Sequence, residues 1–262
     1  MKGNAIMSHA LFDITGKKAI VTGGTRGLGH GVAEGLLEAG AKVVIFGTSA
    51  KVEAVAADFC AKGFDCQGLK VDIASHKERV EGFNRAVALL GGLDILVNAA
   101  GIQRRYPCEQ FPLEDWDDVL EVNLTAPFEL SQLAAREFLK KDVPYGKIIN
   151  FASMLSFFGG FTVPAYAASK GGVTQFSKGM TNELASKGIN INCIAPGYMD
   201  TEMNTALTDP NNPRFKEITD RIPANRWGKP EDLKGAAIFL CSHASDYING
   251  AVIPVDGGYL VK

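Results

Sequence analysis

The 262-residue chain lacks the features that mark several classes of protein. Its five cysteines form no CxxC pair, and its four histidines show no ligand spacing such as HExxH. A disulfide scaffold and a metal site therefore find no support, and the unpaired thiols indicate a reducing compartment, the cytoplasm. The 27 basic and 29 acidic residues nearly cancel, which argues against a partner that is a nucleic acid or an anionic membrane.

The chain also has little that resembles a membrane span. The stretch Ile148–Ser169 carries no charge, but it contains Asn150, Ser153 and Pro164, so we interpret it as a buried strand followed by a loop. The N-terminus has no apolar core of the kind found in signal peptides. We expect residues 1–12 to form an extension ahead of the first strand.

The residues that are present favour an α/β fold. Hydrophobic residues make up 46% of the chain, enough for a large core. Short β-branched runs alternate with helical patterns, which is typical of βαβ units and a buried parallel sheet. The expected strands are Lys18–Thr22, Val43–Phe46, Gln67–Val71, Ile95–Asn98, Lys147–Phe151, Ile189–Ile194 and Ala251–Val255. The expected helices are Leu28–Ala39, Val52–Lys62, Lys77–Leu90, Leu113–Lys140, Tyr166–Lys187 and Glu231–Ser242.

Two places depart from this alternation. Residues 197–225 are rich in Asn, Asp, Thr and Pro, and a loop of this length commonly forms a lid or carries short helices. Pro127 lies inside the long helical region and predicts a kink or a break there. No linker or repeat divides the chain, so we expect a single domain over residues 1–262.

A glycine-rich loop follows the first strand and opens the first helix. The segment TGGTRGLG spans Thr22 to Gly29 and places glycines at 23, 27 and 29. It is neither a GxGxxG fingerprint nor a Walker A loop. Glycines at a strand-to-helix turn let backbone N–H groups approach a pyrophosphate, and the helix dipole favours the anion. The position in the first βαβ unit therefore favours a dinucleotide over an empty turn.

A second constellation carries the chemistry. Tyr166 and Lys170 stand four residues apart in YAASK, which puts both side chains on one helical face. An ammonium beside a phenol favours the phenolate, so we expect a lowered pKa for Tyr166. Such a tyrosine can exchange a proton with an alcohol or carbonyl oxygen. Ser153, just beyond the fifth expected strand, could hydrogen-bond the same oxygen.

In chain order, these motifs resemble the short-chain dehydrogenase/reductase family. The resemblance covers nearly the whole chain and rests on TGGTRGLG, Asp72, NAAG at Asn98–Gly101, Asn123, Ser153, YAASK, and Pro196–Gly197 followed by Thr201. NAAG departs from the commoner NNAG. The resemblance implies a single-domain Rossmann fold, with a doubly wound parallel sheet of about seven strands flanked by helices. It also implies hydride transfer between NAD or NADP and a secondary alcohol or ketone.

The same resemblance implies roles for individual residues. Tyr166 would be the general acid/base, Lys170 would bind the nicotinamide ribose, Ser153 would polarise the substrate oxygen, and Asn123 would hold a water in a proton relay. Asp72 would contact the adenine. The expected cofactor-binding residues are Gly23, Thr25, Arg26, Gly27, Leu28, Gly29, Thr48, Asp72, Ile73, Asn98, Ala99, Gly101, Tyr166, Lys170, Pro196, Gly197 and Thr201.

The end of the second expected strand bears on the choice between NAD and NADP. NAD-specific relatives usually carry an aspartate there, whereas this chain reads FGTS from Phe46 to Ser49. Thr48 or Ser49 could donate to a 2′-phosphate, and Arg26 could pair with it. These residues favour NADP, although NAD bound through backbone contacts stays open.

Three arginines suggest the substrate. Arg104 and Arg105 follow NAAG, and Arg226 stands in IPANRWG. Together with Ser153 and Tyr166 they form the expected substrate site, and basic groups there suit an anionic substrate. The segments resemble sugar-acid dehydrogenases of the gluconate or deoxygluconate type. Solvated or inter-subunit charge is the alternative for such arginines.

Other functions and the assembly also follow from the resemblance. A 3-oxoacyl-carrier-protein reductase shares every catalytic motif, and a nucleotide-sensing regulator could keep the fold without the chemistry. Apolar residues on more than one face of Leu113–Lys140 and Tyr166–Lys187 favour a homotetramer over a monomer with a thicker core.

Overall fold

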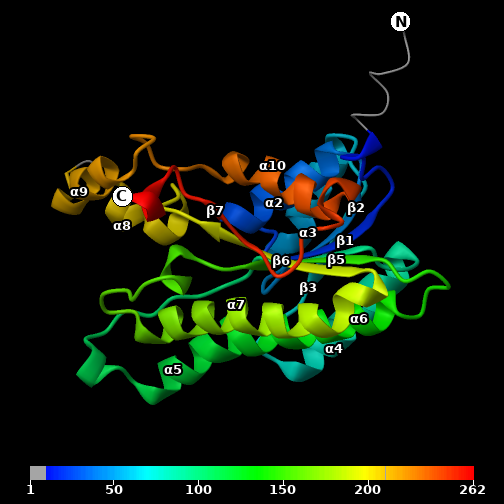
Figure 1. The fold of residues 1–262 in the computed structure, drawn as a ribbon, viewed down its shortest axis with the longest axis horizontal. Coiled ribbons are helices and arrows are strands. Elements are labelled where there is room, and N and C mark those ends of the chain that lie inside the picture. Colours follow the sequence, from blue (N-terminus) through cyan, green and yellow to red (C-terminus); the bar gives the residue numbers. More distant parts are fainter. Residues whose placement is uncertain (1–9, 210) are drawn as a thin grey trace, which may run out of the picture.

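Seven parallel strands form one sheet at the centre of the molecule (Figure 1). The computed structural model describes residues 10–209 and 211–262, so part of the expected N-terminal extension lies outside the described residues. The strand order is β3-β2-β1-β4-β5-β6-β7, and every expected strand is present. The strands are β1 Lys18–Thr22, β2 Lys42–Gly47, β3 Cys66–Lys70, β4 Ile95–Asn98, β5 Gly146–Phe151, β6 Ile189–Pro196 and β7 Val252–Val255.

The sequence forms these strands because the sheet is covered on both faces. All eight residues of β6 and all six of β5 are buried; their apolar side chains join the cores, and polar ones such as Lys147 and Asn190 are buried with hydrogen-bond partners. The strand order reverses between β1 and β4, and such a switch point opens a crevice beyond the carboxyl ends of the strands. We call this side of the sheet the carboxyl edge, and the opposite side the amino edge.

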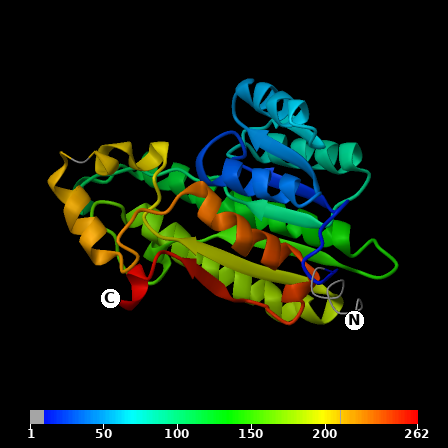
Figure 2. The same cartoon turned by 90° about the horizontal axis from the view of Figure 1, so that it is seen from above.

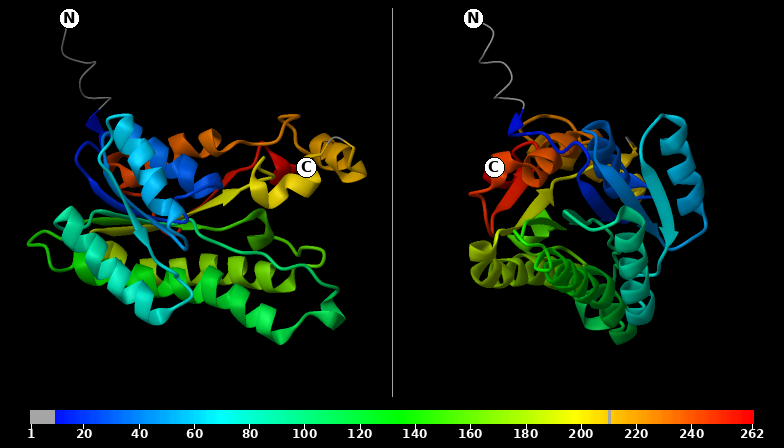
Figure 3. Two further views of the ribbon diagram at one scale, coloured as in Figure 1. Left: turned by 180° about the vertical axis from the view of Figure 1, so that it is seen from behind. Right: turned by 90° about the vertical axis from the view of Figure 1, so that its right-hand side faces the viewer.

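Helices cover the two faces of the sheet as separate layers, which the views from behind and from the side show clearly (Figure 3). One layer holds α2 Gly27–Glu38, α3 Lys51–Ala61 and α10 Lys234–Cys241. The other holds α4 His76–Leu90, α5 Leu113–Leu120, α6 Ala126–Phe138 and α7 Pro164–Leu184. Two apolar cores fill the spaces between sheet and layers. The expected single-domain Rossmann fold is therefore confirmed.

The long helical region Leu113–Lys140 is interrupted earlier than predicted. The five residues Glu121–Thr125 form a π-helical turn between α5 and α6, and Pro127 then sits in the first turn of α6. Proline has no N–H to donate to the carbonyl four residues back, so regular α-helical bonding cannot continue through Asn123. The break that Pro127 predicts thus lies in the turn before it.

The irregular segment 197–225 carries short helices. These are α8 Thr205–Thr208 and α9 Pro213–Arg221, which lie with the C-terminus beyond the carboxyl ends of the strands (Figure 2). The ring of Trp227 stacks on Phe215 of α9, with centroids 6.0 Å apart and planes 7° apart. This contact fixes α9 to the rest of the fold. We call residues 197–225 the lobe.

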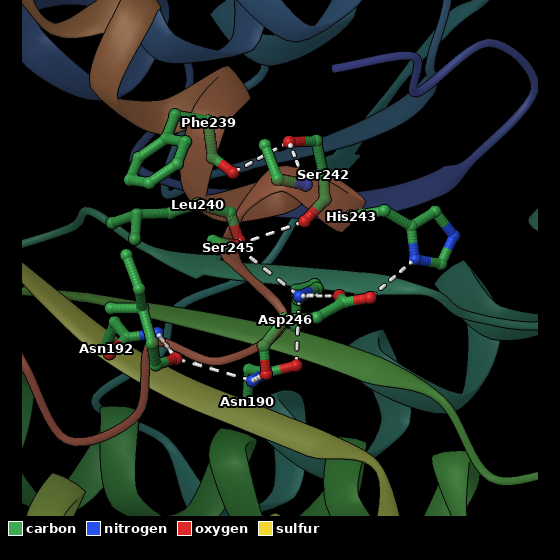
Figure 4. A network of polar contacts seen from close by, with 11 residues as sticks. Asn190, Asn192, Phe239, Leu240, Ser242, His243, Ser245 and Asp246 are labelled. Carbon is green, nitrogen blue, oxygen red and sulfur yellow. Dashed lines mark hydrogen bonds and ion pairs between the residues drawn. The ribbon is translucent and has the colours of Figure 1, made fainter. Parts of the chain in front are cut away.

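A polar network ties together the amino edge of the sheet. Lys147 of β5 is wholly buried, and its Nζ lies 2.7 Å from the Asp246 carboxylate and 2.9 Å from Asn190 Oδ1. His243 contacts the other oxygen of Asp246 at 2.9 Å. Figure 4 shows Asn190, Asp246 and His243 meeting between β6 and the segment that precedes β7. The network lies at the end of the sheet opposite the crevice.

Candidate active site

A cavity of about 640 Å³ opens at the carboxyl edge of the sheet. Its walls come from the glycine-rich loop, from the segments that follow β3, β4, β5 and β6, and from the lobe. These segments are distant in sequence, but parallel strands bring their carboxyl ends to the same edge. The cavity therefore occupies the position where open α/β folds bind ligands.

The glycine-rich loop has the shape of an anion cradle. Gly23 has φ +68°, and a Cβ there would stand 2.9 Å from Ala100 Cα. A Cβ at Gly29 would stand 2.4 Å from the carbonyl oxygen of Gly23. Helix α2 begins at Gly27 with no acidic residue in its first turn, so its free N–H groups favour a negative charge. The loop fits the pyrophosphate of a dinucleotide.

Most of the expected cofactor-binding residues line this cavity. They are Gly23, Thr25, Arg26, Gly27, Leu28, Gly29, Thr48, Asp72, Ile73, Ala99, Gly101, Tyr166, Lys170, Pro196 and Thr201. Asn98 and Gly197 do not belong to the wall. Asn98 is 4% exposed and donates to Asn150 Oδ1 at 2.8 Å, and a Cβ at Gly197 would meet Asp256 Cα at 2.6 Å. Both residues support the wall from behind.

Ser153, Tyr166 and Lys170 meet in the cavity as expected. Helix α7 starts at Pro164, whose fixed φ suits a first helical turn, so Tyr166 and Lys170 lie one turn apart at its beginning. The Nζ atom of Lys170 donates to the Phe151 carbonyl at 2.6 Å and lies 5.6 Å from the centroid of the Tyr166 ring. Ser153 follows β5 and caps a short helix, where its Oγ accepts from Leu155 N–H at 3.2 Å.

Burial dominates the electrostatics of this group. It lowers the pKa of Lys170 from 10.5 to about 8, because the ammonium loses its hydration. It also raises the pKa of Tyr166 above its ordinary value, whereas the hydrogen bond with Ser153 and the charge of Arg105 lower that pKa. The net direction is opposite to the expectation from the sequence. The desolvation of the phenol outweighs the hydrogen bond from Ser153 and the charge of Arg105, both of which favour the phenolate.

Asn123 lies behind the cavity and holds one of its loops. Its side chain is 1% exposed, accepts from Ile102 N–H at 2.8 Å and donates to the Ile102 carbonyl at 2.9 Å. It also donates to Ser169 Oγ at 3.3 Å, which ties the loop to α7. Its expected role in a proton relay stays a prediction, while the contacts show that it positions the residues after β4.

The three arginines expected at the substrate site are separated by the structure. Arg105 lines the cavity, whereas Arg104 and Arg226 do not. Arg104 pairs with Asp115 at 3.1 Å, and Arg226 forms two hydrogen bonds with Asp232 at 2.7 and 2.8 Å. These carboxylates bind the two guanidinium groups outside the cavity, so the structure does not bring them to the substrate.

Sequence reasoning missed two other arginines in the cavity wall. Arg214 and Arg221 of α9 both line it. They stand seven residues apart, two turns of helix, so they share one face of α9. Ile218 lies on the same face and is 3% exposed. The sequence PRFKEITDR could have indicated this face, because it predicts an amphipathic helix with Arg214 and Arg221 on the same side as Ile218.

Comparison with known proteins defines the class of this protein. A family model described as "short chain dehydrogenase" matches residues 17–212, and the chain belongs to this family. It is an oxidoreductase. Among the described residues, no helix is long and apolar enough to span a bilayer, and no cluster of side chains fits a metal ion.

Particular relatives narrow the comparison. The chain is 48% identical to 2-dehydro-3-deoxy-D-gluconate 5-dehydrogenase of Dickeya dadantii, over 96% of this chain and 98% of that protein. It is 40% identical to gluconate 5-dehydrogenase of Gluconobacter oxydans, over 98% of this chain and the whole of that protein. A solved gluconate 5-dehydrogenase of Burkholderia cenocepacia, in complex with NADP and tartrate, superposes with a TM-score of 0.92 at 40% identity, covering 97% and 99% of the two chains.

Proposed function

We propose that the protein is an NAD(P)-dependent dehydrogenase that interconverts a secondary alcohol and a ketone on a sugar acid of the gluconate or deoxygluconate type. One observation carries the proposal. Arg105, whose positive charge reaches Tyr166, lines the same cavity as Ser153, Tyr166 and Lys170. A cation beside a proton-transfer group suits a substrate that carries a carboxylate near its reacting carbon. The named relatives in Dickeya and Gluconobacter support this substrate class.

The chain's own residues divide the chemistry of the reaction. In the oxidative direction Tyr166 takes the hydroxyl proton, and Ser153 orients the substrate oxygen. Lys170 contributes a positive charge that favours the phenolate form of Tyr166. The glycine-rich loop and Asp72, which line the cavity, would hold a nicotinamide dinucleotide, and this group would supply the hydride-transfer chemistry. In the reductive direction Tyr166 returns the proton to the carbonyl oxygen.

We infer that NADP is the preferred cofactor. The residue after β2 is Thr48, which lines the cavity and carries no charge that would repel a 2′-phosphate. Arg26 also lines the cavity, and its Nη1 now pairs with Glu202 at 2.7 Å. The relative from Burkholderia was solved with NADP, which supports the inference. The ratio of kcat/KM with NADPH and NADH tests it, and a strong preference for NADH would overturn it.

A substrate panel tests the reaction. We expect NADP-dependent oxidation of gluconate-type sugar acids to exceed that of neutral polyols, and reduction of an acetoacetyl thioester to be much slower. The Tyr166→Phe variant should lose at least about 100-fold in kcat, because it has no proton to exchange. Faster turnover of the thioester would favour a 3-oxoacyl-carrier-protein reductase. Unchanged turnover in Tyr166→Phe would favour a nucleotide-sensing regulator.

We further propose a cytoplasmic homotetramer. Phe128 on α6 is 43% exposed and pairs edge to face with Phe176 of α7, so an apolar surface lies on the outer side of these helices. A second copy that covers this surface would remove it from water. The five cysteines are all free thiols, in keeping with a reducing compartment. Light scattering tests the assembly, and cell fractionation tests the location.

A further inference from the structure

The arginines near the cavity fall into two groups. Arg26, Arg104 and Arg226 each pair with a carboxylate. The other group lines the cavity, as Arg26 does, but lacks such a partner: across the residues 10–209 and 211–262, no ion pair is formed by Arg105, Arg214 or Arg221. A guanidinium group that lines a cavity without a counter-ion favours the binding of an anion there.

Arg221 is the best anchored of the three. It stands at the end of α9, and its Cζ lies 4.4 Å from the centroid of the Tyr259 ring, which is a cation–π contact. Tyr259 is 4% exposed and contacts the ring of Tyr198 at 5.2 Å and that of Phe158 at 6.3 Å. One face of the Arg221 guanidinium group thus packs on the Tyr259 ring, which its own aromatic neighbours hold in place. Its N–H groups remain available to an anion.

The acidic residues of the cavity wall do not cancel this charge. They are Asp72, Glu202 and Glu217. Asp72 follows β3, at the end of the sheet farthest from β7, and Glu202 is paired with Arg26. Glu217 is the acidic residue that α9 contributes to the wall, and no ion pair joins it to Arg221 despite the four-residue spacing, whereas Asp220, which precedes Arg221, lies outside the wall and pairs with Lys216. Three arginines and one glutamate, Glu217, therefore give this part of the cavity wall a net positive charge.

Arg105 and Arg221 reach the cavity from different walls. Arg105 follows β4, whereas Arg221 belongs to the lobe, which packs against the segment after β7 through Tyr259. The charge of Arg105 also lies close enough to Tyr166 to favour its phenolate. A carboxylate between these walls would meet one cation near the reacting oxygen and a second one on the lobe.

We propose that Arg221 is the specificity-determining residue of the lobe: it binds the carboxylate of the substrate together with Arg105 and so selects sugar acids over neutral polyols. The inference rests on the proposed function and adds the residue that enforces it. Hydrogen bonds between a guanidinium and a carboxylate are among the strong ones in proteins because both partners are charged. The loss of one such partner costs about 10- to 100-fold in affinity.

The test compares D-gluconate with D-glucitol, its neutral counterpart in which a CH₂OH group replaces the carboxylate. In Arg221→Gln we expect the preference for gluconate, measured as the ratio of kcat/KM values, to fall about 10- to 100-fold, mainly through KM. Arg221→Lys keeps the charge without the planar fork and should recover part of the preference. Arg85→Gln, which removes an exposed charge from α4 outside the cavity wall, is the matched control.

A second measurement does not depend on turnover. In the presence of NADP, titration calorimetry should show weaker binding of tartrate to Arg221→Gln by about 10-fold, with unchanged binding to Arg85→Gln. Equal gluconate preference and equal tartrate affinity in wild type and Arg221→Gln would overturn the role of Arg221. A wild-type enzyme that oxidises neutral polyols but no sugar acid would instead overturn the proposed function. A loss of thermal stability in Arg221→Gln is separated from a loss of recognition by the Lys variant and by the calorimetry.

Discussion

The ion pairs of Glu34 allow a quantitative prediction about the free energy of unfolding of the protein. Glu34 lies on α2, and its carboxylate oxygens stand 2.9 Å from Lys234 Nζ on α10 and 2.9 Å from Lys62 Nζ at the end of α3. These two ammonium groups lower the pKa of Glu34 from 4.5 to about 2. We expect Glu34→Gln to destabilise the protein, because the neutral amide cannot form either ion pair.

The magnitude follows from the pKa. A shift from 4.5 to about 2 corresponds to about 3.5 kcal/mol of differential stabilisation of the carboxylate, taking about 1.4 kcal/mol per pKa unit. Lys62 is 53% exposed and its pair is screened by water, and Lys234 keeps a second partner in Glu38 at 2.9 Å. We therefore expect a loss of about 1–2 kcal/mol at pH 7, or a fall in melting temperature of about 2–6 °C.

The dependence on pH has a definite sign. The pKa of Glu34 in the folded state lies below the unfolded value, so its contribution is complete above about pH 4.5 and is lost as the pH falls toward 2. Urea unfolding of wild type and Glu34→Gln should thus differ at pH 7 and differ by less than half as much at pH 3. Glu81→Gln, which removes an exposed carboxylate from α4, serves as the control. Equal midpoints at pH 7, or a difference that does not change with pH, would refute the reasoning.

Three further predictions concern the cavity. Lys170→Met removes an amine that lies 5.6 Å from the centroid of the Tyr166 ring and that stabilises the phenolate when it is charged. The pH at which the oxidation rate levels off should therefore rise by about one unit, as a pH–rate profile would show, and an unmoved profile contradicts this. Glu202→Gln removes the exposed ion pair of Arg26, worth up to about 1 kcal/mol, and leaves Arg26 free for the 2′-phosphate of NADPH. KM for NADPH relative to NADH should therefore fall up to about 5-fold in steady-state assays, and an unchanged KM ratio would contradict this. Gly29→Ala places a Cβ 2.4 Å from a carbonyl oxygen of the glycine-rich loop, so fluorescence titration should show at least about 10-fold weaker NADPH binding, and unchanged binding would contradict the close fit.

The strands could be predicted from the sequence because the sheet is buried on both faces. Burial of the central strands favours β-branched and other apolar residues, as in β1 and β2, and the expected ranges match the observed strands to within about two residues, as β6 shows by continuing from Ile194 to Pro196. The π-helical turn at Glu121–Thr125 could not be predicted, because a shift in helical bonding depends on tertiary contacts. Pro127 indicated only that the helical region is interrupted near this position.

The candidate site was predictable where a residue type and its spacing suffice. Tyr166 and Lys170 lie together because four residues make about one helical turn, and Ser153 joins them because β5 ends next to α7. The arginines were not predictable in this way. A guanidinium side chain is long enough to reach several partners, and the sequence does not show which carboxylate it meets. Arg104 is an example: it pairs with Asp115, a partner that the sequence alone does not indicate.

The same limit applies to the acidity of Tyr166. A neighbouring lysine is visible in the sequence, so an effect that lowers the pKa of the phenol could be predicted. The depth of burial is a property of the folded chain, and here it raises that pKa by more than the polar neighbours lower it. The proton affinity of a catalytic group thus depends on packing as much as on its neighbours in the sequence.

The buried Lys147 network at the amino edge has a consequence for altering this enzyme. Its ties between β5, β6 and the segment before β7 involve no residue of the cavity wall. The lobe, at the other end of the strands, contributes two of the three unpaired arginines. We therefore expect that exchanging the cavity-facing side chains of the lobe alters what the protein accepts without disturbing the Lys147 network. Selectivity and the anchorage of the strands would then be adjustable separately.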